Sequence, residues 1–173
     1  VEELKTLLEE KSAELILLAM PLHQFSALPA GKMNGKTVLD ANNYYPRRDG
    51  HIAALDEYRT TTSQLLADYL PGATVVRAFN AILAADLLTD GRPSAARSRR
   101  ALPVASDDTA AKARVIDLLD QFGFDSVDAG GLARKVTVEV GLSDDKWEEI
   151  TSGLKAGDRV STGPGKVVRG LVE

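Results

Sequence analysis

The sequence predicts an α/β protein built on a parallel sheet. Three observations support this prediction: short apolar runs alternate with amphipathic segments, small or polar residues follow the runs, and Gly or Pro separates many of the segments. Alternation at this spacing is typical of a layered sheet with right-handed crossovers. With 173 residues and 44% hydrophobic side chains, the chain is long enough to bury a core.

The predicted elements follow one another regularly through the first 132 residues. Leu4, Leu7 and Leu8 lie at helical spacing and predict an amphipathic helix over residues 1–13. Buried strands are predicted at residues 14–20, 36–41, 73–78, 101–105 and 124–128. Helices are predicted at residues 60–70, 80–88 and 107–122.

The pattern changes after Gly130 and Gly131. Polar and apolar residues alternate over residues 135–140, which predicts an antiparallel strand with one exposed face. Further short strands are predicted at residues 147–151, 159–161 and 167–171. We therefore expect a domain boundary near residues 132–135, with a partial α/β domain at 14–132 and a small β segment at 133–173.

Composition excludes several classes of function. The net charge of -4 argues against a nucleic-acid partner, because a phosphate-binding surface needs an excess of basic residues. The absence of Cys excludes disulfides, thiolate metal sites and Cys nucleophiles, and two His residues argue against a multi-histidine metal site. No apolar stretch approaches the ~20 residues of a membrane helix. Because the chain begins with Val1, we expect a cut or processed end.

Small and polar residues follow three of the predicted strands. In open α/β sheets, ligands bind at the carboxyl ends of the strands. The residues at those ends are Ala19, Met20 and Pro21, then Asn42 and Asn43, then Phe79 and Asn80. Small residues allow a ligand to approach the backbone, and the amides offer donors and acceptors. An equally good interpretation is that the asparagines cap strand-to-helix turns.

The strand ends belong to longer motifs. These are LLAMP at 17–21, VLDANNYYPRRDG at 38–50, VVRAFNAI at 75–82, LPVASDD at 102–108 and FGFDSVDAG at 122–130. Together they resemble the deazaflavin-dependent NADP reductase family and its dinucleotide-binding relatives, over about two thirds of the chain. The resemblance implies that residues 14–132 form a partial Rossmann-like domain, and a cytoplasmic location.

The same resemblance implies a site for hydride transfer between NADPH and a second redox cofactor, such as a deazaflavin coenzyme. The residues that would line NADP are Ala19, Met20, Pro21, Asn42 and Asn43, while Phe79 and Asn80 would edge the substrate pocket. No catalytic side chain and no metal are implied, since positioning the cofactor supplies most of the protein's contribution.

One family feature is not found in this sequence. The Gly-x-Gly-x-x-Gly turn, which holds the pyrophosphate at a helix N-terminus, has no counterpart, so NADP binding is expected to be weak or lost. Ala81 also stands where related sequences usually carry Thr. Without the family's first strands the sheet would have an open edge, and the N-terminal helix, the tail or a homo-oligomer could cover it.

The tail carries a second resemblance. The segments VEVGLSDD at 138–145 and EITSGLKAGDRV at 149–160 are similar to the membrane-proximal β-domain of periplasmic efflux adaptors. Those proteins couple other components and have no catalytic residues. The two resemblances imply a chimeric chain and different compartments, and the alternative function is a noncatalytic fusion or structural protein.

Three further groups of charged or titratable residues have simpler interpretations. Arg92, Arg97, Arg99 and Arg100 form a basic cluster that could meet a phosphate or belong to a solvated loop. His23 and His51 could be general bases or ordinary loop residues. Residues 47–49, Arg-Arg-Asp, are expected to form surface ion pairs.

Overall fold

A computed structural model describes residues 13–132, 139–143, 147–152 and 167–170 of the chain. The chain divides into two compact units, Val1–Ala133 and Arg134–Glu173. The first twelve residues of the predicted N-terminal helix and the predicted strand at 159–161 lie outside the described residues.

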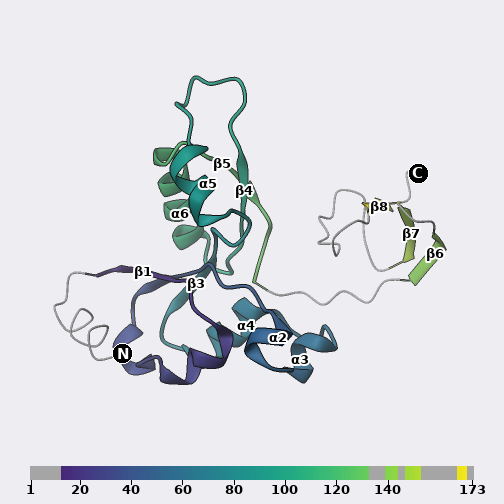
Figure 1. The fold of residues 1–173 in the computed structure, drawn as a ribbon, viewed down its shortest axis with the longest axis horizontal. Coiled ribbons are helices and arrows are strands. Elements are labelled where there is room, and N and C mark those ends of the chain that lie inside the picture. The colour runs from purple at the N-terminus through teal and green to yellow at the C-terminus, as the bar shows by residue number, and fades with distance from the viewer. Residues whose placement is uncertain (1–12, 133–138, 144–146, 153–166, 171–173) are drawn as a thin grey trace. The chain divides into compact units, whose positions relative to one another are not determined.

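The first sheet of the larger unit contains three parallel strands in the order β1-β2-β3 (Figure 1). Their bounds are β1 Leu15–Leu18, β2 Thr37–Asp40 and β3 Thr74–Arg77. The central strand β2 is buried along its whole length, as expected for a parallel strand covered on both faces. In β1 only alternate residues are buried, and Leu15 and Leu17 are exposed.

One face of this sheet packs against helix α4 and two short 3-10 segments. These are α4 Thr62–Tyr69, η1 Leu22–Ala27 and η2 Ala30–Met33. Helix α4 starts where predicted because Thr61 caps it, accepting a hydrogen bond from Gln64 N at 3.1 Å. Leu66 of the helix and Val38 of β2 are fully buried in the resulting core.

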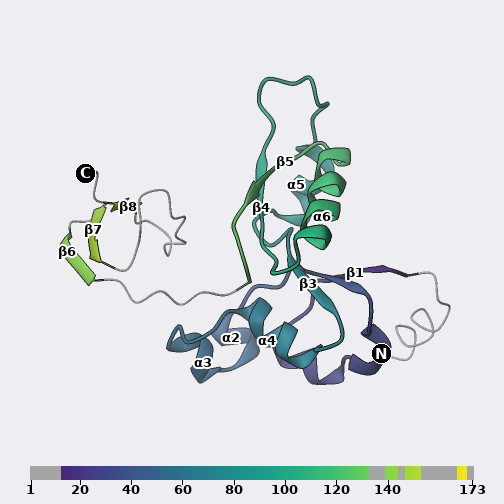
Figure 2. The ribbon, with the colours of Figure 1, turned by 180° about the vertical axis from the view of Figure 1, so that it is seen from behind.

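A second, two-stranded parallel sheet follows, with α6 packed against it (Figures 1 and 2). The elements are β4 Ala101–Val104, α6 Thr109–Gln121 and β5 Asp125–Asp128. Asp108 caps α6, and Gly123 follows the helix with φ 89°, as the sequence predicts. Val76 of β3 shares a core with Val104 and Val115.

The two sheets meet at one antiparallel pair of residues. Arg77 N donates to Ala105 O at 2.8 Å, and Ala105 N donates to Arg77 O at 3.1 Å. The α/β fold with parallel strands is confirmed, but the strands are divided between two sheets where the sequence suggested one. The physical reason is that β3 and β4 approach each other with opposite directions, so the parallel ladder does not continue.

Helix α5 is shorter than predicted. It spans Ala84–Thr89, whereas the sequence placed a helix at residues 80–88. The segment before it turns because Phe79 has φ 62°, a left-handed conformation that a helix cannot contain. The single-turn helices α2 Pro46–Asp49 and α3 Ala53–Asp56 were not predicted, since one turn is too short to show a helical period.

The smaller unit contains a three-stranded sheet of β6 Glu139–Ser143, β7 Trp147–Ser152 and β8 Val167–Gly170. Strands β6 and β7 are antiparallel, and β7 and β8 are parallel. Strand β6 includes the end of the strand predicted at 135–140 and continues to Ser143. Within the described part of the chain, no helix has the length and apolar character needed to cross a membrane.

Candidate functional site

The carboxyl ends of β1, β2 and β3 lie side by side because the strands are parallel and adjacent. Two hydrogen bonds join the predicted site residues across these ends. Met20 N donates to Asn42 Oδ1 at 2.6 Å, and Asn43 Nδ2 donates to Asn80 O at 2.9 Å. The first bond links β1 to β2 and the second links β2 to β3. The structure therefore brings together residues from all three predicted segments.

Asn42 is buried and uses both ends of its amide inside the protein. Its Nδ2 donates to Asp40 Oδ1 at 2.6 Å, and its backbone N donates to the same oxygen at 3.0 Å. Together with the bond from Met20, these contacts favour the interpretation that Asn42 shapes the turn after β2. A place beside a cofactor stays a prediction, and Asn42 would act there by holding the Met20 backbone.

Asp40 and Arg77 form a polar network beneath these turns. Asp40 is fully buried, and its Oδ2 accepts from Ser63 Oγ at 2.5 Å and from Arg77 Nη1 at 3.0 Å. Arg77 Nη1 also lies 2.8 Å from Thr62 Oγ1, and Nη2 donates to Asn43 Oδ1 at 3.3 Å. The pairing avoids the cost of an isolated buried carboxylate. Neither residue is among those predicted from the sequence, although charged residues that end two apolar strands are a usable signal.

Phe79 and Asn80 leave β3 with an unusual backbone. The Phe79 side chain is nearly buried, and its ring centroid lies 6.3 Å from that of Phe122 with a 52° tilt. Asn80 is half-buried, and its Oδ1 is buried without a hydrogen-bond partner. The structure thus packs Phe79 into the second core, while Asn80 keeps one unused acceptor at the strand ends.

The three residues after β1 differ in exposure. Ala19 is exposed, whereas Met20 and Pro21 are half-buried, and Met20 packs against the first core. Backbone approach by a ligand is therefore sterically simplest at Ala19, which has the smallest side chain of the three.

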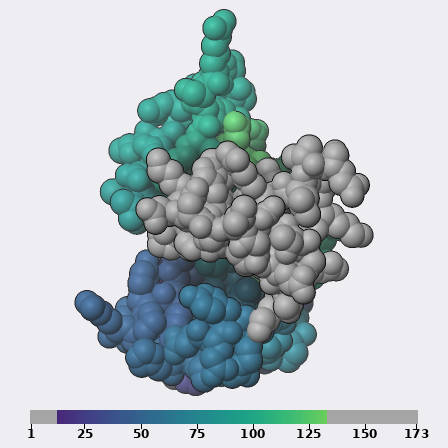
Figure 3. Space-filling model, turned by 90° about the vertical axis from the view of Figure 1, so that its right-hand side faces the viewer, coloured from purple at the N-terminus to yellow at the C-terminus, as the bar shows by residue number. Residues whose placement is uncertain are grey.

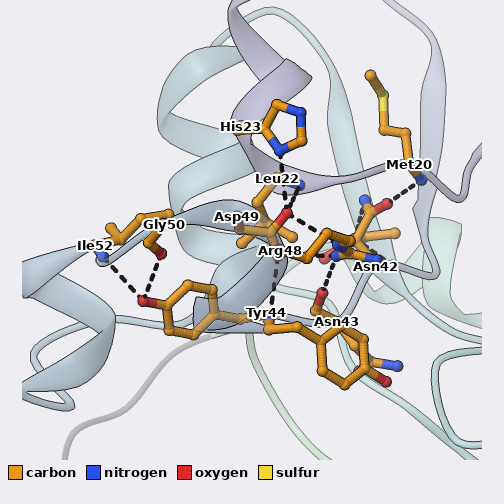
Figure 4. A network of polar contacts seen from close by, with 12 residues as sticks. Met20, Leu22, His23, Asn42, Asn43, Tyr44, Arg48, Asp49, Gly50 and Ile52 are labelled. Atoms are coloured by element: carbon orange, nitrogen blue, oxygen red, sulfur yellow. Dashed lines mark hydrogen bonds and ion pairs between the residues drawn. The ribbon is translucent and has the colours of Figure 1, made fainter.

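Asp49 ties the loop after β1 to the loop after β2 (Figure 4). Its side chain is 0% exposed, and its oxygens accept from Leu22 N at 2.9 Å and from Tyr45 N at 3.0 Å. The Arg48 guanidinium lies 2.9 Å from Oδ2 and lowers the pKa of Asp49 to about 2. His23 Nδ1 is 3.4 Å from Oδ1. The expected surface ion pair is therefore corrected: Arg48 is at the surface, but Asp49 is buried because two backbone amides point at it.

A second network of hydrogen bonds holds the loop between α2 and α3, residues 50–52, against Tyr44. The Tyr44 hydroxyl accepts from Ile52 N at 2.9 Å and lies 2.8 Å from Asp56 Oδ1. Burial raises the pKa of Tyr44, and its hydrogen bond lowers the pKa of Asp56. His51 Nδ1 contacts Asp56 Oδ2 at 3.1 Å. His23 and His51 thus each face a carboxylate, with no nucleophile among the contacts that the structure describes for them.

The basic cluster lies in the loop between α5 and β4, which projects from the larger unit (Figure 3). Its best-buried member, Arg99, is 6% exposed and donates to backbone carbonyls at the end of α6, including Phe124 O at 3.0 Å. Arg100 forms ion pairs with Asp86 and Asp90, at 3.2 and 2.8 Å. Two of the four arginines therefore serve the fold. In the described residues, no group of three or more His, Asp or Glu could hold a metal ion.

Comparisons with known proteins agree with this fold. No family model matches the chain. The rat metalloreductase STEAP3 is 30% identical over 130 residues, which are 74% of this chain. The chain spans only a quarter of that protein's length.

Two solved structures are also similar. A hypothetical protein from Sinorhizobium meliloti has 28% identity and a TM-score of 0.56, over 72% of this chain and 60% of that one. A candidate F420-dependent NADP reductase from Arthrobacter sp. FB24 has 27% identity and a TM-score of 0.57, over 70% of this chain and 57% of that one. These similarities support an oxidoreductase-like domain with a Rossmann-like, dinucleotide-binding fold. They do not support the predicted efflux-adaptor resemblance of the tail.

Proposed function

We propose that residues 14–132 form the nicotinamide-side half of an NADP-dependent oxidoreductase domain. The observation that supports this most directly is the pair of hydrogen bonds from Met20 to Asn42 and from Asn43 to Asn80. They fix the ends of three parallel strands at the edge where α/β sheets bind ligands. The similarity to reductases supports the same assignment.

The strand ends suit the nicotinamide half of the cofactor better than its phosphates. The exposed groups after the strands are small or neutral. The two cations that contact Asn43 are both paired with carboxylates, Arg77 with Asp40 and Arg48 with Asp49. The unpartnered Asn80 Oδ1 adds a neutral acceptor. A carboxamide and a ribose need such groups, whereas a pyrophosphate needs a cradle of amides, and the Gly-x-Gly-x-x-Gly turn that would supply it is not found in this sequence.

The residues of this chain would bind and orient the cofactor. NADPH, when bound, supplies a hydride for a second redox partner such as a deazaflavin. Ala19 and Pro21 would flank the cofactor, while Asn42 holds the Met20 backbone in place. Asn43 fixes the peptide of Asn80. Holding the reacting groups in a fixed geometry is a large contribution to hydride transfer.

Titration with NADPH, followed by the fluorescence of the reduced nicotinamide, tests the proposal. We expect saturable but weak binding, with a Kd of about 1 mM, or about 4 kcal/mol. Asn43→Leu should weaken binding at least about fivefold, since it releases the Asn80 peptide. Asn34→Leu is the matched control, because Asn34 is exposed and precedes the amino end of β2. The absence of saturable binding of both NADPH and nicotinamide mononucleotide would reject the function.

The alternative is a noncatalytic fusion or structural protein, and the separate three-stranded unit favours it. In that case the unit at 134–173 would supply a coupling or assembly surface. Light scattering of the chain with and without residues 134–173 tests this: a change in oligomeric state supports the alternative, and an unchanged state counts against it.

A further inference from the structure

One acceptor at the strand ends, Asn80 Oδ1, is buried but has no hydrogen-bond partner. Among the residues that the structure describes, Asn80 Oδ1 and Ser126 Oγ are buried side-chain atoms without hydrogen bonds. A hydroxyl is both a donor and an acceptor and can rotate to find a partner, whereas an amide oxygen is an acceptor alone and needs a donor directed at it. Buried acceptors in native proteins are normally satisfied by protein, ordered water or ligand. We therefore expect Asn80 Oδ1 to accept a hydrogen bond from a donor outside the described residues.

A strained backbone and a series of hydrogen bonds determine the position of Asn80. The preceding residue, Phe79, has φ 62°, a conformation that is strained for a bulky side chain. The Asn80 carbonyl is held by Asn43 Nδ2 at 2.9 Å, and Asn43 Oδ1 is in turn held by Arg77 Nη2 at 3.3 Å. Arg77 is anchored on the fully buried Asp40. A chain of contacts thus fixes the backbone from which the unused oxygen projects.

We propose that Asn80 Oδ1 accepts a hydrogen bond from the carboxamide N–H of the nicotinamide ring. This inference rests on the proposed function. At the redox end of the dinucleotide, the carboxamide is the group that offers an N–H donor, and an amide oxygen is its natural acceptor. The bond would restrict rotation of the ring and so determine how its reacting carbon is presented. Asn80 is then a positioning and specificity residue for cofactors that carry a carboxamide.

The test removes the two partners of the hydrogen bond separately and together. The ligand partner is removed with the 3-acetylpyridine analogue of NADP, in which a methyl group replaces the amide nitrogen. The protein partner is removed by Asn80→Leu, while Asn80→Asp keeps an oxygen acceptor of the same shape. Affinities of NADP and the analogue are measured by NMR titration for each protein, with Asn34→Leu as the control. Circular dichroism and thermal unfolding establish that each variant is folded.

The wild-type chain and Asn34→Leu should bind NADP about tenfold more tightly than the analogue. Asn80→Asp should keep this preference, and Asn80→Leu should bind the two ligands equally. If Asn80→Leu does not fold, Asn80→Ser, which shortens the side chain, takes its place with the same expectation. An unchanged preference in the folded variant that lacks the acceptor would overturn the inference and assign the site to an ordered water. Failure of the wild-type chain to bind either ligand would instead overturn the proposed function on which the inference rests.

Discussion

Two partly buried arginines of the larger unit contact different kinds of groups. Arg99, 6% exposed, donates to main-chain oxygens at the end of α6, including Gly123 O at 3.1 Å and Phe124 O at 3.0 Å. Arg77, 23% exposed, donates instead to side chains, among them Asp40 and Asn43. Arg99 joins the last turn of α6, through Asp120 O, to the segment that follows it, through Phe124 O, so its contribution is to stability.

The side chains that Arg77 orders lead to the candidate site. Asn43 Oδ1 accepts a hydrogen bond from Arg77, and Asn43 Nδ2 donates another to Asn80 O. The comparison shows that the contacts of a partly buried arginine indicate its role. An arginine that donates mainly to backbone carbonyls stabilises the fold, whereas one that orders the side chains next to a site also affects that site. We therefore expect changes around Arg77 to alter both stability and ligand binding, and changes around Arg99 to alter stability alone.

The largest effect is expected from Asp40→Ala. It leaves the Arg77 guanidinium half-buried without its carboxylate, which should lower the free energy of unfolding by about 3–5 kcal/mol. The matched change, made among the contacts of Arg99, is Asp120→Ala. It also removes the carboxylate partner of an arginine, but the Asp120 side chain is 62% exposed. That change should cost less than about 1 kcal/mol. Urea unfolding measures both, and equal losses would contradict the distinction.

A smaller and more selective effect is expected from replacing the arginines themselves by Met. Arg99→Met should lower the unfolding free energy by about 1–3 kcal/mol, since it removes the hydrogen bond to Phe124 O and the ion pair with Asp120, and should leave NADPH affinity unchanged. Arg77→Met should weaken NADPH binding as well, because Asn43 loses its support. Denaturant unfolding and fluorescence titration of the same samples separate the two outcomes. A loss of affinity in Arg99→Met would show that the helix end also serves the site.

The effect expected over the narrowest range of conditions is a loss of stability at acid pH. The Arg48 hydrogen bond holds the pKa of Asp49 at about 2 in the folded protein, below the value of about 3.9 in an unfolded chain. A lowered carboxyl pKa stabilises the fold above pH 4 and loses that contribution as the pH falls from about 4 to 2. The contribution is about 2 kcal/mol. The free energy of unfolding, measured between pH 4 and pH 2, should fall less steeply with pH in Asp49→Asn than in the wild-type chain. An identical dependence on pH in the two proteins would count against the assignment.

Much of the fold could be predicted from the sequence because buried strands and longer helices leave a local pattern. Strand β2 and helix α6 were found from an apolar run and from a helical period bounded by caps. The division into two sheets could not be predicted, since it depends on the direction in which β4 meets β3 at Ala105. Such long-range pairing leaves no local signal.

The position of three candidate site residues could be predicted for the same reason. Asn42, Asn43 and Asn80 follow apolar runs, which places them at neighbouring strand ends, while their role at a cofactor stays a prediction. The burial of Asp49 could not be predicted, because it comes from the fold of two loops, which bring Leu22 N and Tyr45 N to its oxygens. The role of Asp40 also depends on residues distant in sequence, above all Arg77.

The most direct test of the account is an NMR titration of the isotope-labelled chain with nicotinamide mononucleotide, which carries the nicotinamide half without the second nucleotide. The account predicts saturable shifts of the backbone amides of Met20, Asn42, Asn43 and Asn80, with those of Arg99 and Gly123 unmoved. Shifts confined to the helix end near Arg99, or none at any of these residues at saturating ligand, would contradict it.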